Sequence, residues 1–247
     1  MEQSVGQDIL FLPEVTNCIS SDWVHLNNVL GLYEGNFFIK KISERARDLK
    51  IWVALGSVAV KVNRTDERYV NRSILINSNG SIVAWYDKIH MFDVTLSDTE
   101  SYQESKHYQQ GKHAVLAQTP WANIGLTICY DLRFAGLYRT LAKSGAQILT
   151  VPAAFTCPTG EAHWHTLIKS RAIETGCFLI ASAQTGEHPG SNRKTYGHSL
   201  IVNPWGEVIL DGGKLPGLFF AKLDLREVKS ARNRIPSLSD NSEFKIR

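Results

Sequence analysis

The amino-acid sequence predicts an α/β domain that contains two β-sheets. Strand-like apolar runs alternate with helical patterns along the 247 residues, an order typical of layered α/β folds. Two hairpin segments, SILINSNGSIV from Ser73 and SLIVNPWGEVI from Ser199, carry serine, asparagine and glycine at matching offsets around the turn. The repeated hairpin favours two similar sheets packed face to face, although shared turn chemistry alone could also produce the match. No Pro- or Gly-rich linker divides the chain, which indicates a single unit.

The first part of the chain is expected to form a strand, a helix and a second strand. The apolar run ILFL near the start indicates the first strand, and WVALGSVAV indicates the second. Between them, the segment Phe38–Leu49 has helical spacing, because four apolar residues share one face: Phe38, Ile42, Ala46 and Leu49.

The second half of the chain continues the alternation. Two helices are predicted, at Gly136–Ser144, which Gly145 closes, and at His163–Thr175. Three strands are predicted around them, in the apolar runs IGLTI, QILTVP and CFLIASA.

The longest irregular stretch runs from Phe92 to Lys112 and is rich in polar residues. Structureless segments of this length are commonly functional, so we expect it to border an active site.

Composition favours small-molecule chemistry over binding to nucleic acids or membranes. Lys and Arg outnumber Asp and Glu only by 27 to 24, so no strong field exists to attract a polyanion. No apolar run approaches the roughly 20 residues that span a bilayer, and the polar opening MEQSVGQD does not resemble a secretory signal. We therefore expect a cytoplasmic protein with reduced cysteines.

Cys129 is the candidate nucleophile among four widely spaced cysteines. It follows the apolar run IGLTI and precedes YDLRF, which leads into a helix, so its thiol should lie at a strand-to-helix turn. A helix N-terminus and a nearby cation would lower the pKa of a thiol from about 8.5 toward neutrality. Cys18 and Cys177 are interpreted as structural, and Cys157 as intermediate between the two kinds.

Three segments carry a resemblance to a known family. FLPE at Phe11–Glu14, YDKIHMF at Tyr86–Phe92 and GLTICYDLRF at Gly125–Phe134 resemble the motifs of the nitrilase superfamily of carbon–nitrogen hydrolases. AHW, SRAIET and YGHSLIVNPWGEV extend the match over nearly the whole chain, so residues 1–247 are expected to form one such domain. The resemblance implies a four-layer α-β-β-α sandwich, a homodimer and no cofactor.

The same resemblance assigns roles to the site residues. Glu14 would be the general base, Lys88 the cation that stabilises the tetrahedral intermediate, and Cys129 the nucleophile that forms a thioester. Glu104 would orient the substrate, and the backbone N–H of Tyr130 would complete the oxyanion site. These residue types suit amide hydrolysis, because the amide carbonyl is a weak electrophile and its nitrogen a poor leaving group. The reaction therefore requires a base, a proton donor for the nitrogen and a fixed positive charge beside the oxyanion.

The segments AFTCPTGEAHWHTLIKSRAIET, ASAQTGEH and YGHS most resemble the Nit branch, whose members hydrolyse deaminated glutathione. The alternative is an omega-amidase acting on alpha-keto acid amides, and we expect either activity to release ammonia from a carboxylate-bearing amide. Arg133 is a candidate for binding that carboxylate. Arg193 and Lys194 are further candidates, but they are better interpreted as solvated loop charges.

The family normally has a strand and a long helix before its FPE-like motif, whereas about eight residues precede ILFLPE here. We therefore expect the first strand–helix unit to be absent, which would leave an open sheet edge and weak activity. This departure also motivates a third alternative, a non-catalytic binding protein that keeps the fold.

A metal site is not expected from the sequence. His163 and His165 are two residues apart on a predicted helix, so their side chains face different directions, and no CxxC pair occurs. No GxSxG or GxxxxGK[ST] segment indicates a serine hydrolase or a nucleotide site either.

Overall fold

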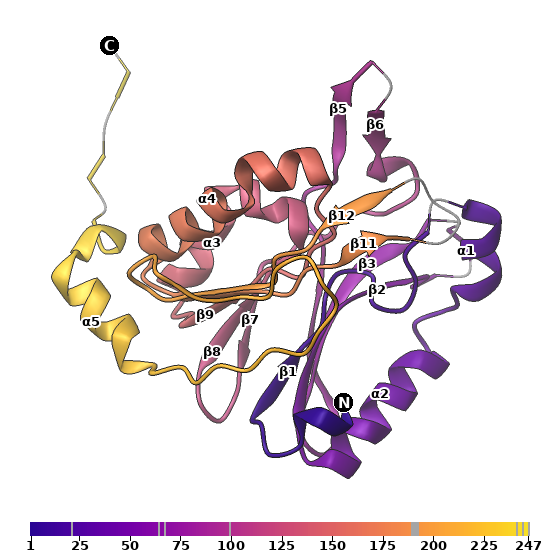
Figure 1. Ribbon diagram of the computed structural model, residues 1–247, viewed down its shortest axis with the longest axis horizontal. Helices are drawn as coiled ribbons and strands as arrows, with labels where there is room; N and C mark the ends of the chain where they lie inside the picture. Colours follow the sequence, from indigo (N-terminus) through magenta and orange to yellow (C-terminus); the bar gives the residue numbers. More distant parts are fainter. Residues whose placement is uncertain are drawn as a thin grey trace.

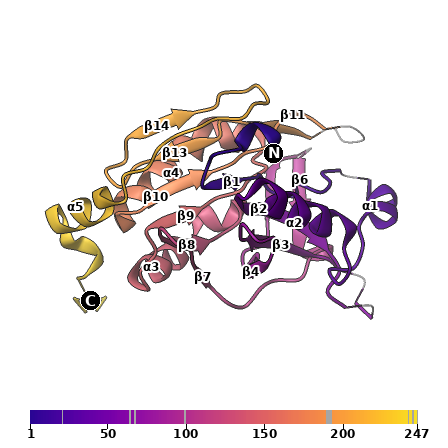
Figure 2. The same ribbon diagram turned by 90° about the horizontal axis from the view of Figure 1, so that it is seen from below.

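The computed structural model describes residues 1–20, 22–63, 65–66, 68–98, 100–188, 193–240, 242–243 and 245–246. Two sheets lie face to face in this part of the chain, and helices cover their outer faces, so the layers run α-β-β-α (Figures 1 and 2). The predicted four-layer sandwich is confirmed.

One sheet has four strands in the order β1-β2-β3-β4, with only the β1–β2 pair parallel. Helix α2 (Phe37–Leu49) packs on its outer face through a cluster that includes Ile39, Ala46 and Leu55. Asn36 is the N-cap of α2, and its side-chain oxygen accepts the backbone N–H of Ile39. The strands are β1 (Ile9–Phe11), β2 (Trp52–Val60), β3 (Val70–Ile76) and β4 (Ile82–Asp87).

The other sheet has six strands in the order β14-β13-β10-β9-β8-β7. Its outer face is covered by α3 (Ala135–Lys143) and α4 (Cys157–Thr175). The strands are β7 (Val115–Gln118), β8 (Asn123–Leu126), β9 (Ile148–Thr150), β10 (Phe178–Ala181), β13 (Leu200–Val202) and β14 (Val208–Asp211).

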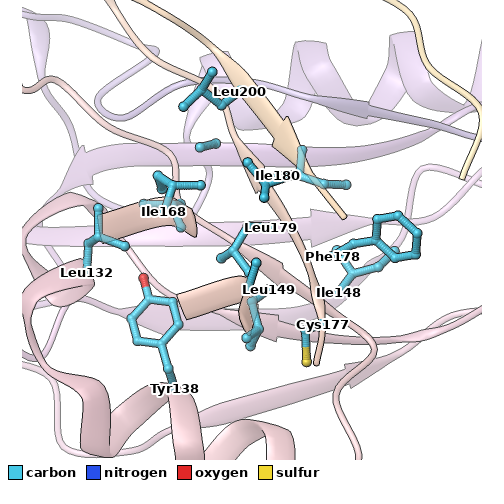
Figure 3. Close-up of a cluster of buried hydrophobic side chains, with 14 of the residues drawn as sticks. Leu132, Tyr138, Ile148, Leu149, Ile168, Cys177, Phe178, Leu179, Ile180 and Leu200 are labelled. Atoms are coloured by element: carbon cyan, nitrogen blue, oxygen red, sulfur yellow. The ribbon is translucent and has the colours of Figure 1, made fainter. Parts of the chain in front are cut away.

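The main core lies beneath α3 and α4 and extends between the two sheets. Figure 3 shows Tyr138 and Ile168, from the helices, beside Leu149 and Leu179, from central strands. Between the sheets, a smaller cluster joins Ala54, Leu75 and Ala117. The apolar strands and the helical faces therefore meet in continuous hydrophobic layers, which is the main favourable contribution to folding.

The remaining elements lie at the rims of the sandwich. Two short hairpins project from it, β5–β6 and β11–β12, and α5 follows a long extended segment near the C-terminus (Figure 1). Their bounds, with those of the remaining helices, are η1 (Glu2–Ser4), α1 (Trp23–Val29), β5 (Asp93–Ser97), β6 (Glu100–Gln103), η2 (Glu104–Lys106), η3 (Cys129–Arg133), β11 (Thr185–Glu187), β12 (Lys194–Tyr196), α5 (Arg226–Arg234) and η4 (Pro236–Leu238).

Most predicted elements are confirmed. Both predicted hairpins are antiparallel pairs, β3–β4 and β13–β14, and they belong to different sheets. Two expectations are wrong. Helix α4 begins at Cys157 rather than His163, and the stretch from Phe92 to Lys112 is not irregular, because it holds the β5–β6 hairpin.

No helix within the described ranges has both the length and the apolar character required to cross a bilayer. β1 pairs only with β2 in the described part of its sheet.

Candidate active site

Glu14, Lys88 and Cys129 meet at one cavity of about 580 Å³. Each follows a strand: Glu14 comes after β1, Lys88 directly after β4, and Cys129 after β8. The Lys88 ammonium Nζ lies 3.2 Å from Glu14 Oε1, and the Cys129 thiol lies near enough to the Glu14 carboxylate for that charge to raise the pKa of the thiol. All three residues are buried, at 5%, 2% and 7% exposure respectively. The three predicted groups therefore share one site.

The Glu14 carboxylate is held from both sheets. The backbone N–H of Ala154 donates to Oε2 at 2.9 Å, and the Asn71 amide donates to Oε1 at 2.9 Å. Burial raises the pKa of Glu14, but the charges of Lys88 and Arg193 and the hydrogen bonds outweigh it and hold the pKa below its ordinary value. The carboxylate is therefore ionised at neutral pH and able to accept a proton.

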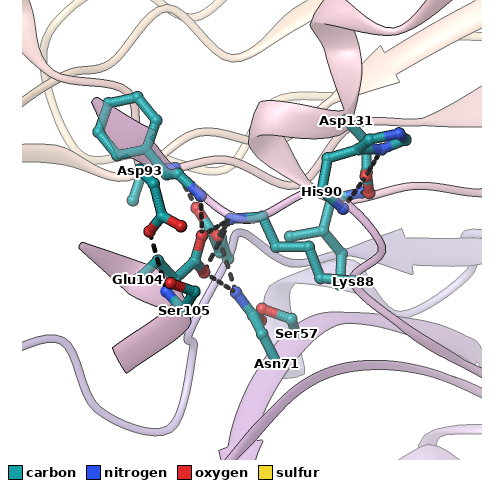
Figure 4. A network of polar contacts seen from close by, with 12 residues as sticks. Ser57, Asn71, Lys88, His90, Asp93, Glu104, Ser105 and Asp131 are labelled. Carbon is teal, nitrogen blue, oxygen red and sulfur yellow. Dashed lines mark hydrogen bonds and ion pairs between the residues drawn. The ribbon is translucent and has the colours of Figure 1, made fainter. Parts of the chain in front are cut away.

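Glu104 is the second carboxylate at Lys88. Its two oxygens lie 2.9 and 2.8 Å from Lys88 Nζ, and the backbone N–H of Phe92 donates to Oε2 at 2.7 Å (Figure 4). Burial lowers the pKa of Lys88, but Glu104 and Glu14 outweigh this effect and raise it above its ordinary value. Lys88 is thus a permanent ammonium placed between two carboxylates.

Cys129 begins the 3-10 turn η3 and has a φ of 48°, in the left-handed region that side chains rarely adopt. Burial and the Glu14 charge raise the pKa of its thiol well above the ordinary value, against the opposite effect of Lys88. The expectation of a thiol pKa lowered toward neutrality is wrong. Burial outweighs the nearby cation, and the α-helix that follows begins only at Ala135.

Asp131 holds the turn at Cys129 in place through its carboxylate. Its fully buried carboxylate accepts the backbone N–H groups of Ile128 at 2.8 Å and His90 at 3.1 Å, and the Tyr86 hydroxyl at 2.7 Å. The His90 ring Nδ1 lies 2.7 Å from the same carboxylate (Figure 4). One carboxylate therefore ties the Cys129 turn to the segment that follows β4 and carries Lys88.

The other predicted residues divide between the cavity wall and the layer behind it. Tyr130 lines the cavity. Arg133 is not among the described residues that line it, and instead stacks over Tyr130 and Phe155, with ring distances of 5.8 and 5.6 Å. Its Nη2 also lies 3.3 Å from the ring Nδ1 of His163.

Arg193 corrects an interpretation made from the sequence. It lines the cavity, packs over the Tyr102 ring and donates to the carbonyl of Ala154, so the solvated-loop interpretation is wrong. Lys194 fits that interpretation, because its side chain is 64% exposed and pairs with Glu187. A positive charge therefore lies on the same wall as Glu14.

Further residues of the cavity carried no motif of their own. Asn71 is a buried amide in strand β3, and its side chain bridges Glu14 and Glu104. The polar run Asn71–Ser73 directly before the apolar residues of this strand was the one available signal. Cys18, interpreted as structural, also lines the cavity, and burial raises its pKa. The segment from 100 to 108 contributes much of the border, as expected.

His163 and His165 contact different partners. His163 faces Arg133, whereas His165 Nε2 lies 3.1 Å from a carboxylate oxygen of Asp211.

Comparisons with known proteins agree with this fold. Residues 1–233 match the model of the carbon–nitrogen hydrolase family. The deaminated glutathione amidase of Yersinia enterocolitica is 41% identical over 203 residues, which make up 82% of this chain and 71% of that protein. The human deaminated glutathione amidase is 37% identical over 238 residues, 94% of this chain and 71% of that protein.

Solved structures give the same family. The NitFhit protein of C. elegans matches with a TM-score of 0.89 at 35% identity, covering 96% of this chain but 58% of NitFhit. Saccharomyces cerevisiae Nit3, described as a member of branch 10 of the nitrilase superfamily, matches with a TM-score of 0.85 at 27% identity, covering 99% of this chain and 86% of Nit3. The family match over most of the chain and the relatives above 30% identity show that this protein belongs to the carbon–nitrogen hydrolase family, in the Nit branch of the nitrilase superfamily.

Proposed function

We propose that this protein is an amidase that hydrolyses deaminated glutathione through a thioester on Cys129. The observation that carries the proposal is the convergence of a buried carboxylate, a buried ammonium and a buried thiol at one cavity. The curated relatives named deaminated glutathione amidase support the substrate.

The first half of the reaction forms the thioester. Because the Cys129 thiol is protonated at rest, Glu14 removes its proton as the sulfur attacks the amide carbonyl. The carbonyl oxygen becomes an oxyanion beside the Lys88 ammonium and the backbone N–H of Tyr130. Glu14 then delivers the proton to the amide nitrogen, the C–N bond breaks, and the amine leaves.

The second half releases the acid. A water molecule attacks the thioester carbonyl while Glu14 accepts its proton, and the C–S bond breaks. The sulfur recovers a proton from Glu14, which restores the starting state. Glu104 is held against Lys88 at both oxygens and orients the ammonium and the incoming substrate. One carboxylate therefore serves as base and as acid in alternate steps.

The choice of substrate changes the leaving group. In deaminated glutathione the amide nitrogen belongs to cysteinylglycine, so the amine of that dipeptide leaves. The ammonia expected from the sequence applies only to primary amides, such as those of an omega-amidase. Arg193 on the cavity wall would pair with a substrate carboxylate, and Arg133 would support the aromatic rings behind it.

The test is an assay of purified protein with deaminated glutathione and, separately, with alpha-ketoglutaramate. Cysteinylglycine released faster than ammonia supports the proposal, and the reverse order favours the omega-amidase. Cys129→Ala should abolish turnover, whereas Cys177→Ser, at a buried thiol in the core, should retain it. Mass spectrometry should detect the acyl adduct on wild type alone. A chain without turnover or adduct on either amide would be the non-catalytic binding protein.

We also propose that the molecule is a cytoplasmic homodimer of single-domain chains. Residues 1–247 act as one domain, since the family match extends to residue 233 and the sheets share core residues. The four free cysteines suit the cytoplasm. A homodimer follows from the family resemblance, and light scattering on the purified protein would measure it.

A further inference from the structure

A second cluster of chemically active side chains lies outside the cavity. His165 comes from α4, Asp211 ends β14, and His198 lies between β12 and β13. His165 Nε2 is 3.1 Å from Asp211 Oδ2, and His198 Nδ1 is 2.9 Å from Asp211 Oδ1. One donor atom from each residue lies within 4.8 Å of the other two. None of the three lines the cavity of Cys129.

The surrounding chain holds these side chains in place. His198 has a φ of 54°, and its backbone N–H donates to Gly213 while its carbonyl accepts the Trp164 indole N–H. The Tyr196 ring stacks on the His198 ring at 4.6 Å. The backbone bonds fix the position of the residue, and the Tyr196 stack and the Asp211 contact hold its ring. The His198 ring is therefore presented in one orientation.

The carboxylate is also prepared for a cation. The Gly213 N–H donates to Asp211 Oδ1 at 2.8 Å. Its two oxygens face the two imidazoles, with Oδ2 toward His165 and Oδ1 toward His198, so the carboxylate is held in an orientation that a shared cation could use.

From this geometry we infer that His165, His198 and Asp211 form a binding site for a divalent transition-metal ion, with Zn²⁺ as the best match. Two imidazoles and one carboxylate, with a fourth position open to water, are a donor set that zinc accepts in proteins. The site is independent of the amidase proposal, because it uses none of the residues of the cavity.

The two distances to the carboxylate fit with small adjustments, and the imidazole donors lie within 4.8 Å of each other. Ligand atoms about 2.0–2.2 Å from a tetrahedral zinc lie about 3.3 Å from one another. The two donor–carboxylate distances here, 3.1 and 2.9 Å, need to lengthen only slightly. The remaining side-chain exposures of 34%, 19% and 35% leave a path for the ion and a water. A bound ion would fasten α4 to β14 and to the turn at His198.

The sequence could not indicate this site. His165 and His198 are far apart in the chain, and the apparent pair of His163 and His165 separates on the helix. The three ligands come together only when β14 lies beside β13 at the edge of the six-stranded sheet.

The experiment is a zinc titration of the chelator-treated full chain, carried out in a Cys129→Ala background to remove the thiol of the cavity. Competition with a chromophoric chelator should give one Zn²⁺ per chain, and Mg²⁺ should not compete. Co²⁺ should give ligand-field bands without a thiolate charge-transfer band. Zinc should also raise the Tm, because it binds the folded state.

His165→Gln and Asp211→Asn should each weaken zinc binding at least tenfold and remove the rise in Tm. His163→Gln is the matched control on the same helix and should bind like the parent. His165 is partly exposed on α4, so its variant should fold. The inference fails if the parent binds no zinc at micromolar concentrations, or if both ligand variants bind as tightly as the parent.

Discussion

Arg193 is a cation that lines the cavity from the segment before β12. It lies on the cavity wall, where its charge also helps to lower the pKa of Glu14. Nothing in its sequence neighbourhood separates it from Lys194, because both follow the same polar sequence HPGSN and neither belongs to a catalytic motif.

Arg193→Gln should raise the KM for carboxylate-bearing amides. The loss of a charge-assisted hydrogen bond corresponds to about 1.5–3 kcal/mol, or roughly 10-fold to 100-fold. A neutral amide of similar size should lose much less, and steady-state kinetics with both amides measure the difference.

Lys194→Gln is the matched control, because Lys194 is the next residue in the chain and its charged side chain is exposed and pairs with Glu187. It should change neither KM. If Arg193→Gln raised the KM for both amides equally, Arg193 would not bind the substrate carboxylate.

The residues of the site were predictable to different degrees. Glu14, Lys88, Glu104 and Cys129 belong to recognisable segments, and the structure brings all four together. Their protonation was not predictable, because the pKa of Cys129 depends on burial and on a carboxylate from a distant segment. Asn71 connects the two carboxylates but has no local motif.

At the scale of elements, the position of Glu14 depends on a close approach between β2 and the end of β1. A Cβ on Gly56 would lie 2.0 Å from the Leu12 carbonyl oxygen and 2.1 Å from that of Pro13. No side chain fits there, since the contacts are rigid backbone. The glycine therefore allows the chain to pass β2 directly before the catalytic carboxylate.

Gly56→Ala should displace Leu12 and Pro13 and move Glu14 away from Cys129. Overpacking of this kind costs about 1–3 kcal/mol of unfolding free energy, and a displacement of about 1 Å reduces kcat by roughly 100-fold. Urea unfolding and steady-state kinetics measure the two effects.

Gly136→Ala is the matched control, because a Cβ at this helical position meets nothing within 4 Å. It should stabilise the protein by about 0.5–1 kcal/mol and leave kcat unchanged. Wild-type turnover in Gly56→Ala would show that the close approach does not position Glu14.

The elements found from the sequence were those with strong periodicity. Helix α2 and the two hairpins were predicted within a few residues. The first turns of α4 were missed, because Cys157–Ala162 contains a proline and a glycine and has no apolar stripe. β5 and β6 were missed because both are short and alternate between exposed and half-buried residues.

At the scale of the whole molecule, the repeated hairpins predicted two sheets but not the order of their strands. Each sheet is completed by strands distant in sequence, as β10 shows by pairing with β9 on one side and β13 on the other. The cavity lies where both sheets contribute, so its shape depends on packing that no single segment encodes.

The same packing buries three titratable groups whose pKa shifts determine how stability depends on pH. The lowered pKa of Glu14 stabilises the fold above its ordinary value of 4.5, and this stability is lost as the pH falls through the folded pKa. The raised pKa of Lys88 stabilises the fold below the ordinary value of 10.5, and this stability is lost as the pH rises through the folded pKa. Cys129 stays protonated when folded but ionises when unfolded above 9.0, so it destabilises the fold at higher pH.

Stability should therefore be highest between about 4.5 and 9.0, and Cys129→Ala should flatten the decline that begins at 9.0. The flattening is partial, because burial also raises the pKa values of Cys18 and Cys177. Above pH 9.0, each such thiol increases the unfolding equilibrium constant by up to tenfold per pH unit. Cys129→Ala removes one such contribution. Urea unfolding of both proteins between pH 7 and 10 measures the difference. Parallel curves would mean that the thiol ionises equally in the folded and unfolded chain, and a resting thiol that needs Glu14 as its base would then be excluded.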